Sequence, residues 1–304
     1  MPPRPPPHTI GPARSLVAQL VLLALALALP SAGNAGDRHI LWAVQGKQNT
    51  VYLLGSVHVL RPGDATLPAV ARHAFDDSER LVMEIDLDEP GSDPLAMAAE
   101  MQQAALLPEG QTLHGVLGGD YASISARAGK AGFDLESLDA FAPWFVAIAL
   151  LDLELANRGF SAEYGIEQTL AARAIEEHKP IEGLETAAEQ FQMLAGMPLA
   201  QQKRFLMMTL DESAQLDSEL GQLLRAWQSG DTETLARLLS TEYEKFPDLY
   251  RRLTVDRNRA WVVRLAALMD HRDDYLVVVG ALHLVGPESV VDLLRKRGYT
   301  VTQQ

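Results

Sequence analysis

The pattern of apolar and polar positions predicts strands near both ends of the chain and helices between them. Runs rich in β-branched and aromatic residues occupy 39–44 and 50–54, and the polar segment 45–49 between them is typical of a hairpin. Further strands are predicted at 81–87, 180–182, 274–279 and 299–302. The third of these has no polar residue between Tyr275 and Val279, which indicates a strand buried on both faces.

The middle of the chain, about 92–265, has a mostly helical pattern that Pro and Gly interrupt at regular intervals. Helices are predicted over 67–75, 94–107, 119–132, 143–157, 166–177, 199–224, 231–244 and 288–297. We therefore expect an α/β fold whose central mixed sheet is interrupted by a large helical insertion at about 92–265. Residues 36–304 are expected to form a single domain.

Two similar motifs follow two of the predicted strands. Gly55-Ser56-Val57-His58 comes after the strand at 50–54, and Gly280-Ala281-Leu282-His283 comes after the strand at 274–279. Each end of the chain thus runs strand, Gly-x-x-His, Gly/Pro loop, helix, strand, which indicates two related units in one sheet. Short units of this kind favour parallel pairing, and ligands of open α/β sheets bind where the strands' carboxyl ends meet. We expect both histidines at that edge.

Two imidazoles and one carboxylate would form a metal site with nitrogen and oxygen ligands. Glu84 is the favoured carboxylate, late in the strand at 81–87, with Asp86 as its neighbour. Such ligands suit Zn, Mn, Co or Fe(II). The alternative is that each histidine is a hydrogen-bonded structural residue, since Gly-x-x-His is a common sequence. The chain has no HExxH, GxSxG or Walker A motif, and no GxGxxG after a strand.

The first residues have the pattern of a secretory signal peptide. Residues 1–14 contain two arginines and no acid, the run 16–29 is almost wholly apolar, and small residues follow Pro30. We predict cleavage after Ala35 and export, most simply to a bacterial periplasm. The alternative is an uncleaved anchor, although the apolar run is shorter than the roughly 20 residues that span a bilayer. No later stretch is predicted to cross a membrane.

Charge and composition exclude several classes of protein. The 304 residues include 26 Lys and Arg against 40 Asp and Glu, a formal net charge of −14, with no dense basic run. Nucleic acid is therefore not an expected partner, because phosphate binding needs a basic surface. The chain has no Cys, which excludes a thiolate nucleophile, a Zn–Cys site and a lipid anchor on Cys.

Six segments in this order resemble the TraB/GumN family, which includes the Tiki proteases and the PrgY-type pheromone-shutdown proteins. They are YLLGSVHVL, LVMEID, GIEQTL, KPIEGLET, RNRAW and YLVVVGALHL. The resemblance covers the chain from about residue 39 to its end. It implies a fold shared with the erythromycin esterases (EreA) and ChaN-like proteins. In Tiki relatives it implies an Mn- or Co-dependent protease that acts on a secreted protein.

The resemblance also implies roles for particular residues. His58 and His283 would be metal ligands, and Glu84 would be a ligand or a general base. Arg257 and Asn258 would stand near the metal and polarise a carbonyl; the alternative is a pair on a helix surface.

Two further carboxylates lie in the matching segments. Glu167 departs from the family pattern, which more often has Asp there, and is carried over as a catalytic candidate with a longer reach. Glu185 is interpreted as a cap of the helix that follows Gly183.

Three functions fit these observations. The first is an exported metal-dependent hydrolase, a peptidase in which a divalent metal (Mn, Co or Zn) activates water against a peptide or protein substrate. The second is a protein that binds a peptide or saccharide without turnover. The third is a metal-free, esterase-like hydrolase in which one histidine is the base. The sequence leaves the substrate, the metal and the oligomeric state open.

Overall fold

A computed structural model describes residues 38–64, 66–86, 94–213 and 215–304. The predicted signal peptide, residues 1–35, and the last residue of the predicted strand 81–87 lie outside the described residues. No helix in the described part of the chain is long and apolar enough to cross a bilayer.

Six strands form one mixed sheet, as the α/β prediction expects, in the order β4-β3-β5-β2-β1-β6. They are β1 (Leu41–Gln45), β2 (Thr50–Ser56), β3 (Arg80–Ile85), β4 (Ile181–Glu185), β5 (Tyr275–Gly280) and β6 (Val301–Gln303). Strand β5 lies between β2 and β3 and is parallel to both, and β3 is parallel to β4. Strand β1 is antiparallel to β2 and β6. The two-unit, erythromycin-esterase-like arrangement stays a prediction.

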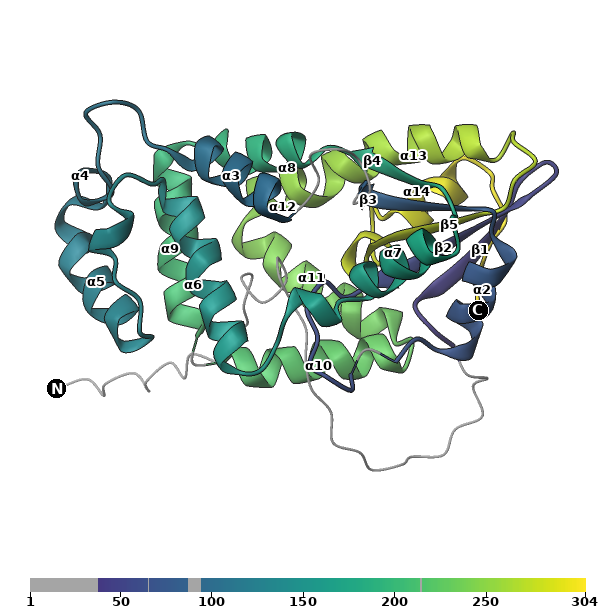
Figure 1. The fold of residues 1–304 in the computed structure, drawn as a ribbon, viewed down its shortest axis with the longest axis horizontal. Coiled ribbons are helices and arrows are strands. Elements are labelled where there is room, and N and C mark those ends of the chain that lie inside the picture. The colour runs from purple at the N-terminus through teal and green to yellow at the C-terminus, as the bar shows by residue number, and fades with distance from the viewer. Residues whose placement is uncertain (1–37, 65, 87–93, 214) are drawn as a thin grey trace, which may run out of the picture.

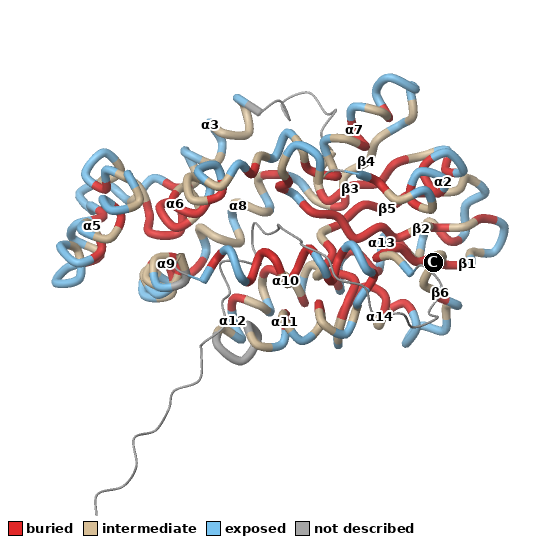
Figure 2. Tube along the Cα trace, turned by 90° about the horizontal axis from the view of Figure 1, so that it is seen from below, coloured by how far each residue is buried: buried red, intermediate tan, exposed pale blue. Residues whose placement is uncertain are grey.

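Helices cover both faces of the sheet (Figures 1 and 2). α2 (Ala69–Asp77) and α7 (Ile166–Glu176) lie together on one face, where the guanidinium of Arg173 stacks 4.3 Å from the ring centroid of Phe75. α13 (Asp256–Leu268) and α14 (Val290–Lys296) pack together on the other face. A sheet covered on both sides accounts for the wholly apolar sequence of β5.

The remaining helices lie mostly beyond the end of the sheet where β3 and β4 lie (Figure 1), but those at 216–228 and 232–245 also reach β2 and β6. Trp227 donates to the Gly55 carbonyl of β2, and Gln303 of β6 donates to the Gly230 carbonyl between these two helices. The remaining helices are α3 (Pro94–Ala105), α4 (Leu113–Leu117), α5 (Tyr121–Lys130), α6 (Pro143–Asn157), α8 (Ala187–Ala195), α9 (Leu199–Glu212), α10 (Leu216–Gln228), α11 (Thr232–Lys245) and α12 (Pro247–Tyr250). Short 3₁₀ turns occur at Gly118–Asp120, Glu136–Leu138, Ala162–Tyr164 and Ala281–His283, and a π-helical turn, Arg251–Val255, runs directly into α13. The helical middle predicted at about 92–265 thus contains one strand, β4.

Buried apolar side chains form one continuous cluster that includes the sheet and the helices around it (Figure 2). Trp144 of α6 and Trp261 of α13 are among its largest fully buried members.

The prediction of one helix over 199–224 is wrong, because α9 ends at Glu212 and α10 begins at Leu216. At this break the Ser213 hydroxyl donates to the carboxylate of Glu154, and its carbonyl accepts from Arg158 at 3.3 Å. Side chains at the C-terminal end of α6 therefore hydrogen-bond to Ser213 at the break, where its carbonyl lacks the amide partner of a continuous helix.

Three other predicted helices begin two residues later than expected. The helix predicted at 67–75 is α2, which begins at Ala69, directly after Pro68. Residues 119–132 form a helix only from Tyr121, after a 3₁₀ turn that starts at Gly118 with a φ of 56°. α14 begins at Val290, because Glu288 has a φ of 59° and the Ser289 hydroxyl caps the helix by accepting from the Asp292 amide at 3.1 Å. β6 likewise begins two residues after the predicted 299, beyond a turn at Gly298.

Candidate active site

The two Gly-x-x-His motifs leave the sheet side by side. Ser56 pairs with Gly280 in the register of the parallel strands β2 and β5. A Cβ placed ideally on Gly280 would lie 3.3 Å from His58 Nε2, 3.4 Å from Glu84 Oε1 and 3.6 Å from His283 Cδ2. The two histidines and the carboxylate of β3 therefore surround one point at the carboxyl edge of the sheet.

Gly55 permits this close approach of the two strand ends. A Cβ there would lie 2.2 Å from Cγ2 of the buried Ile40 and 3.0 Å from the backbone of Ala281. The Gly55 carbonyl also accepts a hydrogen bond of 2.7 Å from the Trp227 indole, which holds the end of β2 against α10. The first glycine of this motif is thus required by packing.

Asn258 decides which nitrogen of His283 carries the proton. The Asn258 side-chain NH₂ donates to the Glu288 carbonyl at 2.8 Å, so its Oδ1 is the atom that lies 2.7 Å from His283 Nδ1. Because Oδ1 can only accept, Nδ1 carries the proton and Nε2 keeps its lone pair. Burial lowers the pKa of His283 and the positive charge of Arg257 lowers it further, to about 3, so the ring is neutral.

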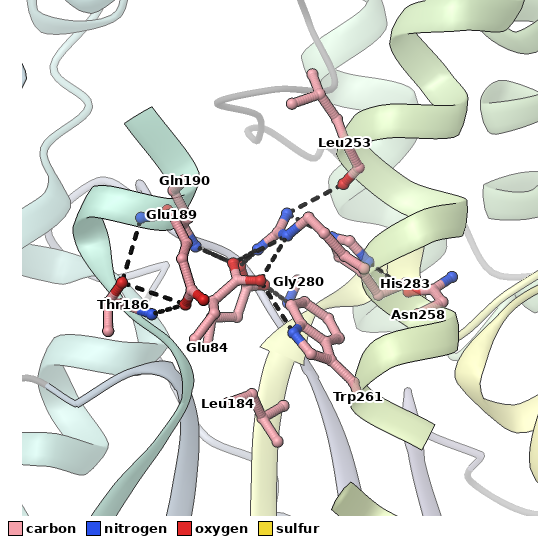
Figure 3. Close-up of polar contacts among 12 residues, drawn as sticks. Glu84, Leu184, Thr186, Glu189, Gln190, Leu253, Asn258, Trp261, Gly280 and His283 are labelled. Atoms are coloured by element: carbon pink, nitrogen blue, oxygen red, sulfur yellow. Dashed lines mark hydrogen bonds and ion pairs between the residues drawn. The ribbon is translucent and has the colours of Figure 1, made fainter. Parts of the chain in front are cut away.

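Arg257, on the first turn of α13, connects the carboxylates of two strands. Figure 3 shows Glu84, Trp261 and His283 gathered around these contacts. Its Nε donates to Glu185 Oε1 at 2.9 Å, and its Nη2 donates to both Glu185 and Glu84. The guanidinium stacks 4.5 Å from the ring centroid of Trp261, whose indole NH donates to Glu185 Oε2 at 3.0 Å. Burial lowers the pKa of Arg257, but the two carboxylates more than offset this effect and raise the pKa above its ordinary value. The buried guanidinium therefore stays charged.

Glu84 is buried and accepts hydrogen bonds on both oxygens. Oε1 accepts from the Gly280 amide at 2.8 Å, and Oε2 accepts from Arg257 and, at 3.3 Å, from Gln190 of α8. Burial raises the pKa of Glu84, but Arg257 and the two histidines outweigh it and hold the pKa well below its usual range. The carboxylate is therefore ionised at neutral pH.

His58 forms a second cluster with Glu167 of α7. Glu167 Oε1 lies 2.6 Å from His58 Nδ1 and accepts from the Ser56 hydroxyl as well, whereas its buried Oε2 has no hydrogen-bond partner. The His58 side chain remains 45% exposed. The surrounding protein lowers the pKa of His58, but the charge and hydrogen bond of Glu167 more than offset this and raise it to about 9. The Ile166 amide, which donates to the Val57 carbonyl at 3.1 Å, fixes α7 against this loop.

A cleft of about 390 Å³ opens beside these groups. We refer to His58, Glu84, Glu167 and Arg257 as its floor. The other lining residues, which are apolar except for Gln168 and Gln190, are its walls. A volume of this size lies in the range of about 300–1,000 Å³ that is usual for small-ligand pockets. The floor carries a cation, two carboxylates and an imidazole, which are the groups that hydrolysis of a carbonyl compound uses.

The structure brings all six candidate residues to this region: His58, Glu84, Glu167, Arg257, Asn258 and His283. The alternative of Arg257 and Asn258 as a surface pair is wrong, because the Arg257 side chain is 12% exposed and Asn258 is fully buried. The prediction that Glu185 caps α8 is also wrong. Thr186 is the cap, in a reciprocal capping box with Glu189.

Sequence reasoning missed Glu185 as the partner of Arg257, Trp261 as its stacking platform and Gln190 as a donor to Glu84. A signal for Trp261 was present in the segment RNRAW. Arg257 and Trp261 are four residues apart, and residues at that spacing face the same side of a helix.

The histidine and carboxylate side chains gathered here are of types that bind divalent metal ions. Among the described residues, no group of three or more His, Cys, Asp or Glu side chains is arranged so that it could hold a metal ion. Arg257 contacts two atoms that would bind a metal ion: it donates to Glu84 Oε2 and lies 3.2 Å from His283 Nε2. His58 Nε2 and the ionised Glu84 carboxylate lie around one point, and His283 approaches it through Cδ2. The three side chains are nevertheless a donor set for a divalent cation, provided that Arg257 releases His283 Nε2.

Fold and site together define an α/β protein with a histidine–carboxylate–arginine cluster at the carboxyl edge of a mixed sheet. The chain belongs to the TraB/PrgY/gumN family, whose sequence profile matches residues 40–303. An uncharacterized protein of Treponema pallidum is 28% identical over 293 residues, covering 89% of this chain and 84% of that protein. The uncharacterized protein YbaP of Escherichia coli is 28% identical over 250 residues, covering 80% and 87%.

A more distant relative has a named activity. Metalloprotease TIKI2 of Xenopus tropicalis is 25% identical over 319 residues, covering 86% of this chain and 59% of that protein. No solved structure matches the chain.

Proposed function

We propose that this protein is an exported, metal-dependent hydrolase that cleaves peptide bonds at the cluster around Glu84. The observation that carries the proposal is the convergence of His58 Nε2, Glu84 Oε1 and His283 on one point, with atom distances of 3.3–3.6 Å from it. Membership of the family and the likeness to a protein named a metalloprotease support it. Export rests on the pattern of residues 1–35.

Three side chains would hold the cation: His58, His283 and Glu84. A bound Mn²⁺, Co²⁺ or Zn²⁺ ion supplies a lowered pKa for water and polarisation of a carbonyl. Asn258 prepares His283 for this role by keeping its proton on Nδ1, so that the Nε2 lone pair, which lies 3.2 Å from Arg257 Nη1, can bind a cation once Arg257 moves away. Glu84 is a better ligand than base, because its pKa is held low.

Glu167 is the better candidate for the general base. Its Oε2 is buried at the cleft floor without a hydrogen-bond partner, so it can accept a proton from water. As this proton passes to Glu167, the water oxygen bonds to the substrate carbonyl carbon. The carbon–nitrogen bond then breaks, and Glu167 returns the same proton to the leaving amine. Arg257, moved away from His283 but still bonded to Glu185, would stabilise negative charge on the carbonyl oxygen.

A second candidate function is a hydrolase that needs no metal. The His58–Glu167 pair favours it, because a carboxylate on Nδ1 holds the imidazole with its opposite nitrogen at the cleft. With a pKa of about 9, His58 is a general acid at neutral pH and becomes a base as pH rises through about 9. In that case a chelator leaves activity unchanged, whereas His58→Ala abolishes it.

Metal content and peptidase activity, measured together, test both functions. The parent, His58→Ala and His283→Ala are loaded with Mn²⁺, Co²⁺ or Zn²⁺, desalted and analysed for metal. The matched control is His271→Ala, because His271 contacts the Tyr275 hydroxyl at the opposite end of β5. We expect about one metal ion per chain in the parent and control, and none in the other two. Absence of metal from all four, with no effect of metal on thermal stability, would overturn the proposal. Chelator-resistant peptide cleavage would then identify the second function.

A further inference from the structure

The walls of the cleft differ sharply from its floor. Apart from the four charged or titratable groups and the amides Gln168 and Gln190, the described lining is apolar. It comes from separate elements and includes Met83 and Ile85 of β3, Met101 of α3, Ile148 of α6, and Met193 and Leu194 of α8. Three of these side chains are methionines, which are unbranched, polarizable and able to adapt to differently shaped apolar groups. Helices of the middle segment and strand β3 thus supply the apolar lining, whereas the charged groups come from the sheet edge, α7 and α13.

The charged residues that line the cleft all belong to the floor. Arg257 is paired with Glu84, and Glu167 is paired with His58. Of the two neutral amides among the lining residues, Gln190 already donates to Glu84 and to Glu185, the latter at 2.7 Å. A charged substrate side chain would therefore find no counter-ion on the walls. Gln168 is the other lining amide, so the many hydroxyls of a saccharide would lose water there for few hydrogen-bond partners, which costs binding energy.

The apolar wall also touches the catalytic floor directly. Leu253 lines the cleft, and its carbonyl accepts a hydrogen bond of 3.1 Å from Arg257 Nη1. An apolar group on this wall consequently lies next to the cation that would face the reacting carbonyl.

We infer that the substrate is a peptide that places a large apolar side chain, such as that of Leu, Met or Phe, in this cleft next to the bond that is cleaved. The inference rests on the proposed function and specifies its substrate class. One methylene group in an apolar pocket changes discrimination by about 10- to 200-fold, and Leu is larger than Ser by more than one such group. We therefore expect at least tenfold preference for Leu over Ser at the position that enters the cleft.

Binding is measured first, without turnover, so that the two proposals can fail separately. Fluorescently labelled peptides of one scaffold, with Leu, Ser, Asp or Lys at a single position that is moved along the peptide, are titrated onto full-length His58→Ala. One position should show at least tenfold tighter binding of the Leu peptide. Equal affinities of the four peptides at every position would overturn the inference. If the preference is present but the metal-loaded parent cleaves none of them, the inference stands and the proposed hydrolase fails.

A wall variant in the parent background tests the same point. Met193→Asp should reduce the Leu-to-Ser binding ratio at least tenfold, and Met101→Asp, on a different helix, should do the same. The matched control is Val263→Asp, because Val263 is an apolar residue of α13 that is 60% exposed and does not line the cleft. Circular dichroism identifies variants that do not fold. An unchanged ratio in either folded wall variant would overturn the inference.

Discussion

Asn258 Oδ1 accepts a hydrogen bond of 2.7 Å from His283 Nδ1. The other end of the amide is anchored at the Glu288 carbonyl, 2.8 Å away, so the amide cannot turn over without losing both bonds. Asn258 is fully buried, and therefore water cannot replace it. A helix residue thus fixes the proton position of a histidine that follows a strand.

Replacing Asn258 with Leu should weaken metal binding by about 10- to 100-fold, the usual effect of removing a group that orients a metal-binding histidine. Calorimetric titration with Mn²⁺ or Zn²⁺ measures the affinity, and the ¹⁵N shifts of His283 report the tautomer independently. The control is Asn157→Leu, at the exposed end of α6, which should leave both readouts unchanged. A variant that keeps the proton on Nδ1 would contradict the role of Asn258.

Removing the cation of Arg257 should be strongly destabilising. Arg257→Gln leaves the buried carboxylates of Glu84 and Glu185 without their shared partner, and breaking a buried ion pair in this way costs about 3–5 kcal/mol. Urea denaturation measures the free energy of unfolding. Arg259→Gln is the matched control: Arg259 is two residues away and 59% exposed in its pair with Glu288, and such pairs contribute about 0–1 kcal/mol. Equal losses in the two variants would contradict this account.

Gly280→Ala should lower activity with little change in stability, whereas Gly55→Ala should lower stability. Gly280 has φ −51° and ψ 133°, which alanine adopts readily, so the free energy of unfolding should change by no more than about 1 kcal/mol. The added methyl would lie among His58, Glu84 and His283 and should lower kcat/KM by about 10².

Gly55→Ala forces a methyl against the side chain of Ile40 and should cost about 1–3 kcal/mol of stability. Thermal unfolding and peptidase assays of both variants are the measurements. A Gly280→Ala protein with parental activity and metal content would show that the point is not part of the site.

The pKa of His58 should depend on Glu167. In metal-free protein the pKa is about 9, and Glu167→Gln should lower it to 6.5 or below, because burial then acts without the compensating carboxylate. Since the folded pKa exceeds the unfolded value, the stabilisation by the pair is complete below about pH 6.5 and is lost as pH rises through about 9. NMR titration of the imidazole and denaturation at several pH values measure both effects. Glu163→Gln, an exposed neighbour, is the control.

Part of the site could be predicted from the sequence because it depends on local pattern. A buried strand that ends in Gly-x-x-His places the histidine at the sheet edge, and this identified His58 and His283; the position of Glu84 late in a strand had a similar basis. Arg257, Asn258 and Glu167 were found only through the family resemblance. Nothing local distinguishes a buried arginine on a helix from an exposed one such as Arg259, two residues away.

The sequence by itself determined the α/β class, most of the strands and the two histidine motifs, because alternation, helical spacing and turn residues act between near neighbours in the chain. Only the tertiary structure decided the partners of the charged groups. Glu185 follows a strand and precedes a helix, which is the local signature of a cap, yet it binds Arg257, 72 residues away. The reason is electrostatic: a carboxylate and a guanidinium that the fold buries together must pair, whatever their separation in sequence.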